Sequence, residues 1–356
     1  MEFNDVRLQY GLLRNELDSV IGQVFESGRY ILGPAVEHFE EEFARYCRAA
    51  NGIAVGSATS ALSIGLRAVG VEPGDEVLVP AVSAPATAMA VALIGARPVF
   101  ADISPDDFMM DPAIAQELAT RRTKAIVPVH LYGMPARLKE LSKTGITMIE
   151  DASQAHGSDA NWGRCGSFGE LAAFSFYPTK NLGTYGDGGM LVTSQAPLAE
   201  RCRMLRNYGQ RENYNSEVIG ENSRLDDLHA AILRVKLKKL DEWNLRRRAA
   251  AATYREAFQE LPIKLQVETG KSNYHLFVVT TPERDGLHAY LAERDIPTLV
   301  HYPIPLPRQK AFAEFAPARC PRADAFCSRV LSLPIHGSIS DGDVNRVIDA
   351  VRGFFT

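Results

Sequence analysis

The sequence predicts an α/β fold: a doubly wound, mostly parallel sheet in a large domain of residues 1–240, and a smaller C-terminal α+β domain of residues 241–356. Three observations lead to this prediction. The chain has 356 residues, enough for about two domains at ~150 residues each. Short apolar runs alternate with helical patterns over its first two-thirds, which is typical of strands joined by crossover helices. Two further apolar runs and two helical patterns follow, enough for a second, smaller unit.

The elements of the large domain can be assigned in order. A helix begins at Asp111–Pro112, where aspartate caps the helix and proline occupies its first turn, and others are expected at 60–69 and 86–94. The last two apolar runs are joined by a glycine-rich loop instead of a helix. Such sheets bind ligands at the carboxyl ends of their strands. Strands are expected at 52–55, 76–79, 98–101, 124–129, 146–149, 171–176 and 189–193.

The remaining third of the chain is predicted to be mainly helical. One long helix is expected from about residue 225 to 258, with strands at 274–280 and 331–334 and helices near 284–294 and 341–354. The long helix carries many basic residues, which raises the possibility of a nucleic-acid site. Acidic residues are interleaved with them, so a solvated helix face is the favoured interpretation.

Composition and charge exclude several classes of protein. With 46% hydrophobic and 23% charged residues, the chain has the profile of a globular protein. Its net charge of −4 argues against a general binder of nucleic acid or anionic membranes. The first residues are acidic where a secretory leader is basic, and no apolar run reaches the ~18 residues of a membrane span. The five scattered cysteines form no CxxC pair, which predicts reduced thiols, no metal site and a cytoplasmic location.

The first candidate site residue is a carboxylate at a strand end. The apolar run 146–149 is followed directly by Glu150 and Asp151. At the carboxyl end of a parallel strand, Asp151 could hold a cationic group. It could equally be the N-cap of a following helix, and the residue alone does not decide between the two.

The second candidate is a lysine on a loop. The strand at 171–176 ends before Pro178, and Lys180 follows, with glycines at 183, 186, 188 and 189. A lysine desolvated near the strand ends would have a lowered pKa, and its free amine would be a nucleophile toward aldehydes. For a single lysine, the simpler interpretation is a solvated surface residue.

The third candidate is an anion-binding turn. The segment Val55–Leu62 passes through small residues from a strand into a helix, so its backbone N–H groups and the helix dipole could bind an anion. It lacks the Gly-Lys-Ser/Thr of a Walker A loop and the G-x-G-x-x-G of a dinucleotide site. A plain turn with a Ser/Thr cap is the alternative. Together, however, an anion cup, a strand-end carboxylate and a loop lysine are what pyridoxal 5'-phosphate (PLP) needs for its phosphate, its pyridinium nitrogen and its aldehyde.

A series of motifs then identifies a family. They occur in order along the whole chain: Gly28–Pro34, Gly74–Val77, His130–Gly133, Glu150–Gly157, Gly166–Gly169, Phe174–Asn181, Gly188–Met190 and Asn222–Asp226. With these motifs, the chain resembles the sugar aminotransferases of the DegT/DnrJ/EryC1/StrS family. The resemblance implies the aspartate aminotransferase-like fold, PLP fold type I, for the large domain.

The resemblance also implies roles for individual residues. Lys180 would bind PLP as a Schiff base and move protons, and Asp151 would keep the pyridinium nitrogen protonated. Gln154 would lie against the ring or its phenolic oxygen. The phosphate would be held by Ser57, Ala58, Thr59 and Ser175, and by Asn222 from the neighbouring subunit of a homodimer with shared sites. Ala84 stands where the family has an aromatic residue stacked on the ring. Either a side chain from elsewhere covers the ring, or the space is open and makes room for an unusual substrate; an open face is the working hypothesis.

The implied reaction is amino transfer. L-Glutamate would donate its amino group, and the acceptor would be a keto group, at C3, of a nucleotide-linked deoxy- or amino-sugar. Asn213 and Pro307 depart from the residues usual in the branch of the family that aminates C3. The candidate substrate contacts are Tyr177, Tyr185, Arg224, His301 and Tyr302.

Two other functions remain open at this point. Relatives that dehydrate sugars carry histidine at the lysine position, so the presence of Lys180 favours amino transfer. A non-catalytic regulator that binds a sugar or cofactor on the same fold is the second alternative. An added DNA-binding domain would support it, and the sequence shows no segment that reads as one.

Overall fold

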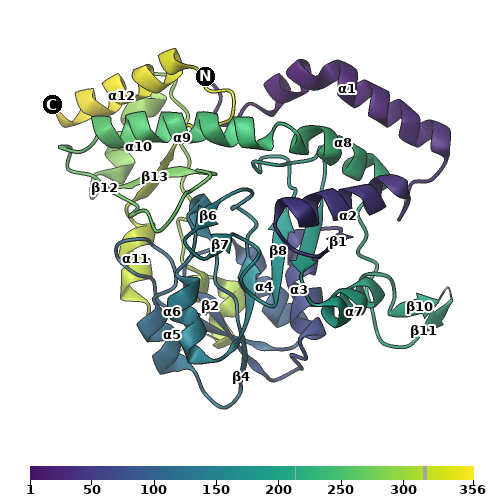
Figure 1. Ribbon diagram of the computed structural model, residues 1–356. Coiled ribbons are helices and arrows are strands. Elements are labelled where there is room, and N and C mark those ends of the chain that lie inside the picture. Colours follow the sequence, from purple (N-terminus) through teal and green to yellow (C-terminus); the bar gives the residue numbers. More distant parts are fainter. Residues whose placement is uncertain (213, 316–318) are drawn as a thin grey trace.

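The computed structural model describes residues 1–212, 214–315 and 319–356. Its central element is a seven-stranded sheet in the order β1–β9–β8–β5–β4–β2–β3 (Figure 1). The strands from β3 to β8 run parallel, whereas β9 is antiparallel to both β8 and β1. The mostly parallel sheet predicted from the sequence is therefore confirmed. Its strands are β1 Asn51–Val55, β2 Glu76–Pro80, β3 Arg97–Ala101, β4 Thr123–Ile126, β5 Thr147–Asp151, β8 Leu171–Ser175 and β9 Gly189–Thr193.

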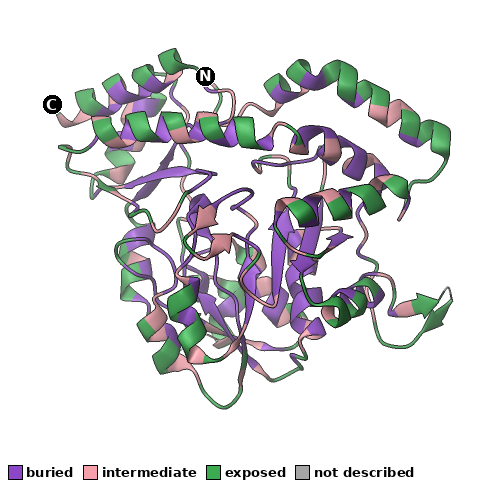
Figure 2. Cartoon of the chain, in the orientation of Figure 1, coloured by how far each residue is buried: buried purple, intermediate pink, exposed green. Residues whose placement is uncertain are grey.

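Helices cover both faces of this sheet, and β8 shows why. Its side chains alternate between two apolar clusters, with Leu171 and Ala173 in one and Ala172 and Phe174 in the other. The first face is covered by α3 (Ala58–Ala68), α4 (Pro85–Leu93) and α7 (Ala196–Arg206), and the second by α2 (Pro34–Tyr46) and α8 (Asp227–Leu237). Because both faces are covered, β2, β8 and β9 are buried along their whole length (Figure 2).

The smaller domain is built on a three-stranded antiparallel sheet, β12 (Lys264–Leu265), β13 (Phe277–Thr280) and β14 (Val330–Leu333). It packs with α9 (Leu240–Ala257), α10 (Arg284–Ala292) and α12 (Asp341–Phe355) around an apolar cluster of its own. By contrast, α11 (Pro321–Cys327) packs into the cluster of the large sheet. The α+β character expected for this region is present, and the boundary at residue 240 stays a prediction.

Three expected elements differ in extent. The prediction of one long helix at 225–258 is wrong, because this segment forms two helices, α8 and α9. The first buries its apolar side against α1 and α2, whereas the second packs on the small domain. The strand expected at 124–129 ends at Ile126, two residues before Pro128, which has no N–H to donate. The strand expected at 274–280 begins only at Phe277, since the Leu276 N–H is used on the carbonyl of Tyr132.

The other elements connect or flank these two units. The N-terminal α1 (Val6–Ser27) lies on α8, and Asp111 caps α5 as expected by accepting the N–H of Ala113. Within the described ranges, no helix is both long and apolar enough to cross a membrane. The remaining segments are α5 Pro112–Leu118, α6 Leu138–Leu141, β6 Asp159–Ala160, β7 Gly163–Arg164, β10 Gln210–Glu212, β11 Asn215–Ser216, and 3-10 turns at Leu131–Gly133, Ser142–Thr144, Leu306–Arg308 and Lys310–Phe315.

Candidate active site

The sheet brings the expected cofactor ligands to one edge. Asp151 ends β5 and pairs with Ala173 of β8. Two residues later, Ser175 ends β8 opposite Gly189, and Gly189 also lies opposite Val55 at the end of β1. The carboxylate, the serine and the turn that follows Val55 therefore lie together at the carboxyl ends of the strands, where a doubly wound sheet binds its ligand.

The turn after β1 has the geometry of an anion cup. Ser57 is the N-cap of α3, and its hydroxyl accepts the N–H of Ser60 at 3.1 Å. Capping does not exclude anion binding, because the N–H groups of Ala58 and Thr59 in the first turn have no partner within the helix. A Cβ on Gly189 would lie 2.8 Å from the Ala58 nitrogen, so only glycine allows the neighbouring strand to approach this closely. The backbone donors of this turn suit a phosphate group.

Asp151 is a buried carboxylate with a fixed orientation. It is 4% exposed, and one oxygen accepts the hydroxyl of Thr87 at 2.7 Å while the other accepts the N–H of Ser153 at 3.2 Å. The residues after Asp151 form turns, not a helix, so the capping interpretation is wrong. Thr87 was not singled out from the sequence. The sequence offered only a weak indication of its role: Thr87 lies in an apolar helical run, four positions after another hydroxyl residue, Ser83.

Lys180 lies on the loop after β8, as expected, and is partly buried. Burial lowers the pKa of its amine to about 8, against the opposing effect of the nearby Asp151 charge. The loop is closely packed, since a Cβ on Gly183 would meet the Pro178 carbonyl oxygen at 2.5 Å. The amide of Asn4 also donates to the carbonyl of Thr179 at 2.8 Å. A partly buried lysine with a lowered pKa is what a nucleophilic amine requires, whereas a fully solvated surface lysine would keep its ordinary pKa.

A buried amide next to Lys180 ties its loop to the small domain. Asn181 donates to the side-chain oxygen of Asn244 at 2.9 Å and to the carbonyl of Asn273 at 3.1 Å. Its own oxygen lies 3.1 Å from Nδ1 of His275, so the imidazole must be the donor. Burial and the Lys180 charge lower the pKa of His275, which keeps the ring neutral. None of these three partners was predicted from the sequence, because they lie far apart in the chain.

Gln154 connects the two domains at the same site. Its oxygen accepts the N–H of Tyr132 at 2.6 Å, and its NH2 group donates to the Tyr302 hydroxyl at 3.1 Å. The Tyr132 hydroxyl donates to the carbonyl of His301. Burial raises the pKa of Tyr302 to about 12, and burial with the Lys180 charge lowers that of His301 to about 4. The structure thus places Tyr302 against Gln154 and His301 near Lys180.

Two further aromatic candidates flank the lysine loop. Tyr177 is 52% exposed and directly precedes Pro178. Tyr185 is partly exposed, and the amine of Lys236 lies 4.3 Å from the centre of its ring. His156, on the segment after β5, lies among the rings of Phe43, Phe174 and Phe176.

Other candidates lie at the surface of the chain. Arg224 stacks on Tyr208 and lines a cavity of about 660 Å³ with Asn207 and Tyr214. Asn222 is exposed, and the next residue, Ser223, accepts the N–H of Gly56 at 3.1 Å beside the anion cup. No contact within the chain joins Arg224 to Lys180 among the interactions described.

Three positions that depart from the usual residues of the family are Ala84, Pro307 and Asn213. Ala84 is half-buried in extended conformation directly before α4. Pro307 is buried in the turn Leu306–Arg308. Asn213 lies outside the described residues.

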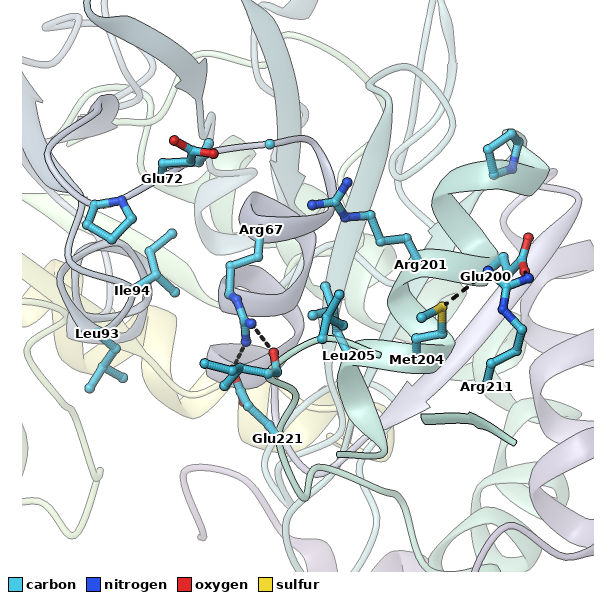
Figure 3. Close-up of a pocket in the computed structure, with 16 residues that line it drawn as sticks. Arg67, Glu72, Leu93, Ile94, Glu200, Arg201, Met204, Leu205, Arg211 and Glu221 are labelled. Carbon is cyan, nitrogen blue, oxygen red and sulfur yellow. Dashed lines mark hydrogen bonds and ion pairs between the residues drawn. The ribbon is translucent and has the colours of Figure 1, made fainter. Parts of the chain in front are cut away.

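A separate cavity of about 660 Å³ lies between the ends of α3 and α4 and the helix α7 (Figure 3). Arg67 crosses it to pair with Glu221 at 3.5 Å and to reach the carbonyl of Ile219. None of the expected site residues lines this cavity. In the described part of the chain, no three His, Cys, Asp or Glu side chains are grouped as metal ligands would be.

Comparison with known proteins identifies relatives of the whole chain. A dTDP-3-amino-3,4,6-trideoxy-alpha-D-glucose transaminase of Streptomyces venezuelae is 47% identical, over 98% of this chain and 95% of the relative. A pleiotropic regulatory protein of Geobacillus stearothermophilus is 41% identical, over 99% and 97%. The crystal structure of S. venezuelae DesV in complex with a ketimine intermediate superimposes with a TM-score of 0.97 at 46% identity, covering 99% of this chain and 97% of that one.

The family predicted from the motifs is confirmed by a match along almost the full length. The model of the DegT/DnrJ/EryC1/StrS aminotransferase family matches residues 12–352. The similarity to DesV extends over the large and small domains alike, so the fold is that of these aminotransferases. The chain belongs to the DegT/DnrJ/EryC1/StrS aminotransferase family.

Proposed function

We propose that the protein is a PLP-dependent aminotransferase that moves the amino group of L-glutamate to a keto group, at C3, of a nucleotide-linked deoxy- or amino-sugar. One observation carries the proposal: a partly buried lysine with a lowered pKa and a buried carboxylate meet an anion cup at one edge of the sheet. The family supports the cofactor and the reaction class. The name of the transaminase relative, whose product carries an amino group at C3, supports the position on the sugar.

The residues present fit the parts of PLP. The N–H groups of Ala58 and Thr59, with Ser57 and Ser175, suit the phosphate, and Asp151 suits the ring nitrogen. Lys180 would bind the aldehyde, and Gln154 would lie against the ring or its phenolic oxygen. When bound, PLP supplies an electron sink that stabilises negative charge at the substrate carbon which loses a proton.

The protein contributes positioning and proton transfer. The Lys180 amine would act as the general base that takes the proton from Cα of glutamate, and as the acid that gives it back. A pKa of about 8 suits both duties near neutral pH, because the amine accepts a proton readily and gives it up readily. Asp151 would pair with the ring nitrogen and keep it protonated. His301 and Tyr302 face the site from the small domain, where the sugar would enter.

We further propose a homodimer with shared sites. Exposed apolar side chains gather around the hairpin β10–β11: Tyr208 is 44% exposed, Tyr214 98% and Ile219 86%. Asn222 lies exposed at the base of the same hairpin. A second copy that covered this surface would bury the apolar groups and let Asn222 reach the partner's phosphate cup.

The alternatives account for the site less well. The relatives that dehydrate sugars carry histidine at the lysine position, whereas this chain has Lys180. A regulator such as the Geobacillus relative's name describes needs a binding surface but not an amine with a lowered pKa. Amino transfer uses every group that the sheet edge brings together.

The proposal is tested with a panel of nucleotide-linked 3-keto and 4-keto sugars. The protein is loaded with pyridoxamine 5'-phosphate and mixed with each sugar, and the products are analysed by mass spectrometry. We expect an amino sugar from at least one 3-keto substrate. Amination of only 4-keto sugars would overturn the assignment to C3, and loss of water from a sugar without a gain of nitrogen would favour the dehydratase.

A further inference from the structure

Two buried hydroxyl groups, of Ser83 and Thr87, are linked by consecutive hydrogen bonds to the carboxylate of Asp151. The Ser83 and Thr87 hydroxyl oxygens are 2.9 Å apart, and the Thr87 oxygen is 2.7 Å from Oδ2 of Asp151. Ser83 is 2% exposed, Thr87 0% and Asp151 4%. These hydrogen bonds join the turn after β2, the first turn of α4 and the end of β5, and Thr87 and Asp151 are 64 positions apart in the sequence.

The hydrogen positions follow from the chemistry of the groups. An ionised carboxylate only accepts, so the Thr87 hydroxyl donates to Asp151. The Thr87 oxygen is then the acceptor for the Ser83 hydroxyl, which fixes the rotamer of Thr87. The other carboxylate oxygen accepts the N–H of Ser153. With one donor on each oxygen, the plane of the carboxylate is fixed, and lone pairs remain on its accessible side.

Packing alone does not require a hydroxyl at position 87. The neighbours of Thr87 on the same helix are apolar and buried, including Ala88, Ala90 and Val91. Valine has the same shape as threonine and would fill this space. The hydroxyl is therefore present for the contact that it makes, and that contact is with the proposed ligand of the cofactor's ring nitrogen.

We propose that Thr87 is a positioning residue: its hydroxyl, oriented by Ser83, holds the Asp151 carboxylate in the plane in which it binds the protonated ring nitrogen of PLP. This inference rests on the proposed function, because it assumes that PLP occupies the site. Without the hydroxyl, the carboxylate can rotate about its Cβ–Cγ bond, and the bond to the ring nitrogen loses its alignment.

Three variants and one control test the inference. Thr87→Val removes the hydroxyl at constant shape, Thr87→Ser keeps it, and Ser83→Ala removes the group that orients it. Thr193→Val is the matched control, since Thr193 is a buried threonine whose hydroxyl donates to the Glu170 carbonyl at 2.6 Å, on a different segment of the sheet. The dissociation constant of PLP is measured by titration of each apo protein. The 15N chemical shift of ring-labelled PLP then reports the state of the ring nitrogen.

We expect Thr87→Val to weaken PLP binding about tenfold, the effect of one charge-assisted hydrogen bond, and to move the 15N shift toward the unprotonated value. Thr87→Ser should restore both, Ser83→Ala should weaken binding about twofold, and Thr193→Val should change neither. Unchanged binding and an unchanged 15N shift in Thr87→Val would overturn the inference. If the unmodified protein itself bound no PLP, the proposed function would fail first, and the two failures are thereby distinguished.

Discussion

The Nδ1–H of His275 donates to the side-chain oxygen of Asn181 at 3.1 Å, directly beside Lys180. Asn181 also donates to Asn244 and to the carbonyl of Asn273, so it uses its full amide in a buried network. The backbone next to Lys180 is thus fixed without help from the lysine side chain. Removal of that side chain should leave the loop in place.

The first prediction concerns Lys180→Ala. We expect the protein to fold with an unfolding temperature close to that of the unmodified chain, because the network around Asn181 is intact. It should form no covalent adduct with PLP after borohydride reduction and show no turnover with glutamate. Peptide mass mapping of reduced samples gives the measurement, and Lys238→Met controls for loss of an exposed lysine outside the loop. A reduced PLP adduct that persists in Lys180→Ala would refute the assignment.

The sequence could predict the site residues at strand ends but not those that long-range contacts bring to the site. Asp151, Lys180 and the segment at Ser57 were identifiable because each lies at or shortly after the end of a strand, and topology places strand ends together. Thr87, Asn181 and His275 were not identifiable in the same way. Their partners lie 64, 63 and 94 residues away in the chain, and no local pattern distinguishes such a side chain from one that merely packs.

In the fold, too, the sequence predicted elements with a local pattern but not a feature that depends on long-range packing. The alternation of strands and helices predicted the large sheet, because a strand buried on both faces leaves a short apolar run in the sequence. The break between α8 and α9 has no proline or glycine to mark it. It arises because the two helices pack on different domains, which only the assembled structure determines.

The second prediction concerns pH. The pKa of Lys180 is lowered to about 8 in the native state, whereas an unfolded lysine titrates near about 10.4. Between these values the unfolded chain binds more protons than the native one, so the contribution of Lys180 to stability rises with pH across this window. Below about pH 8 the cost of burying the ammonium is fully present.

Labelling of the apo protein measures this pKa. The rate at which an amine-specific acylating reagent modifies Lys180 is followed by mass spectrometry as pH is raised, and its midpoint should lie near about 8. Lys236, whose pKa is also lowered to about 8 by burial, is an internal control for access, because it is 0% exposed and should stay unlabelled. A midpoint for Lys180 near about 10 would contradict the account.

The third prediction concerns shared sites. Lys180→Ala and Asn222→Asp proteins are each expected to be inactive. After subunit exchange, a hybrid dimer has one site with both changes and one with neither. Equal mixing makes about half of the dimers hybrid, so about a quarter of the unmodified activity should return. If exchange is demonstrated by mass spectrometry and no activity appears, Asn222 does not complete the partner's site.

The fourth prediction concerns Ala84. Its extended backbone, at φ −60° and ψ 146°, is compatible with phenylalanine. A ring there should stack on the cofactor and tighten PLP binding by roughly two- to tenfold, measured by titration of the apo protein. Ala84→Leu controls for added apolar area without a ring. If Ala84→Phe expels the cofactor or fails to fold, another side chain already fills the space, and the open face must be abandoned.

The most direct test of amino transfer uses the amino donor alone. The PLP-loaded protein is mixed with excess L-glutamate in the absence of any sugar, and 2-oxoglutarate is quantified in a single turnover. The account predicts one 2-oxoglutarate per Lys180 site, with conversion of the bound cofactor to its amine form, and none with Lys180→Ala. Absence of 2-oxoglutarate from protein shown to hold PLP would contradict the central claim.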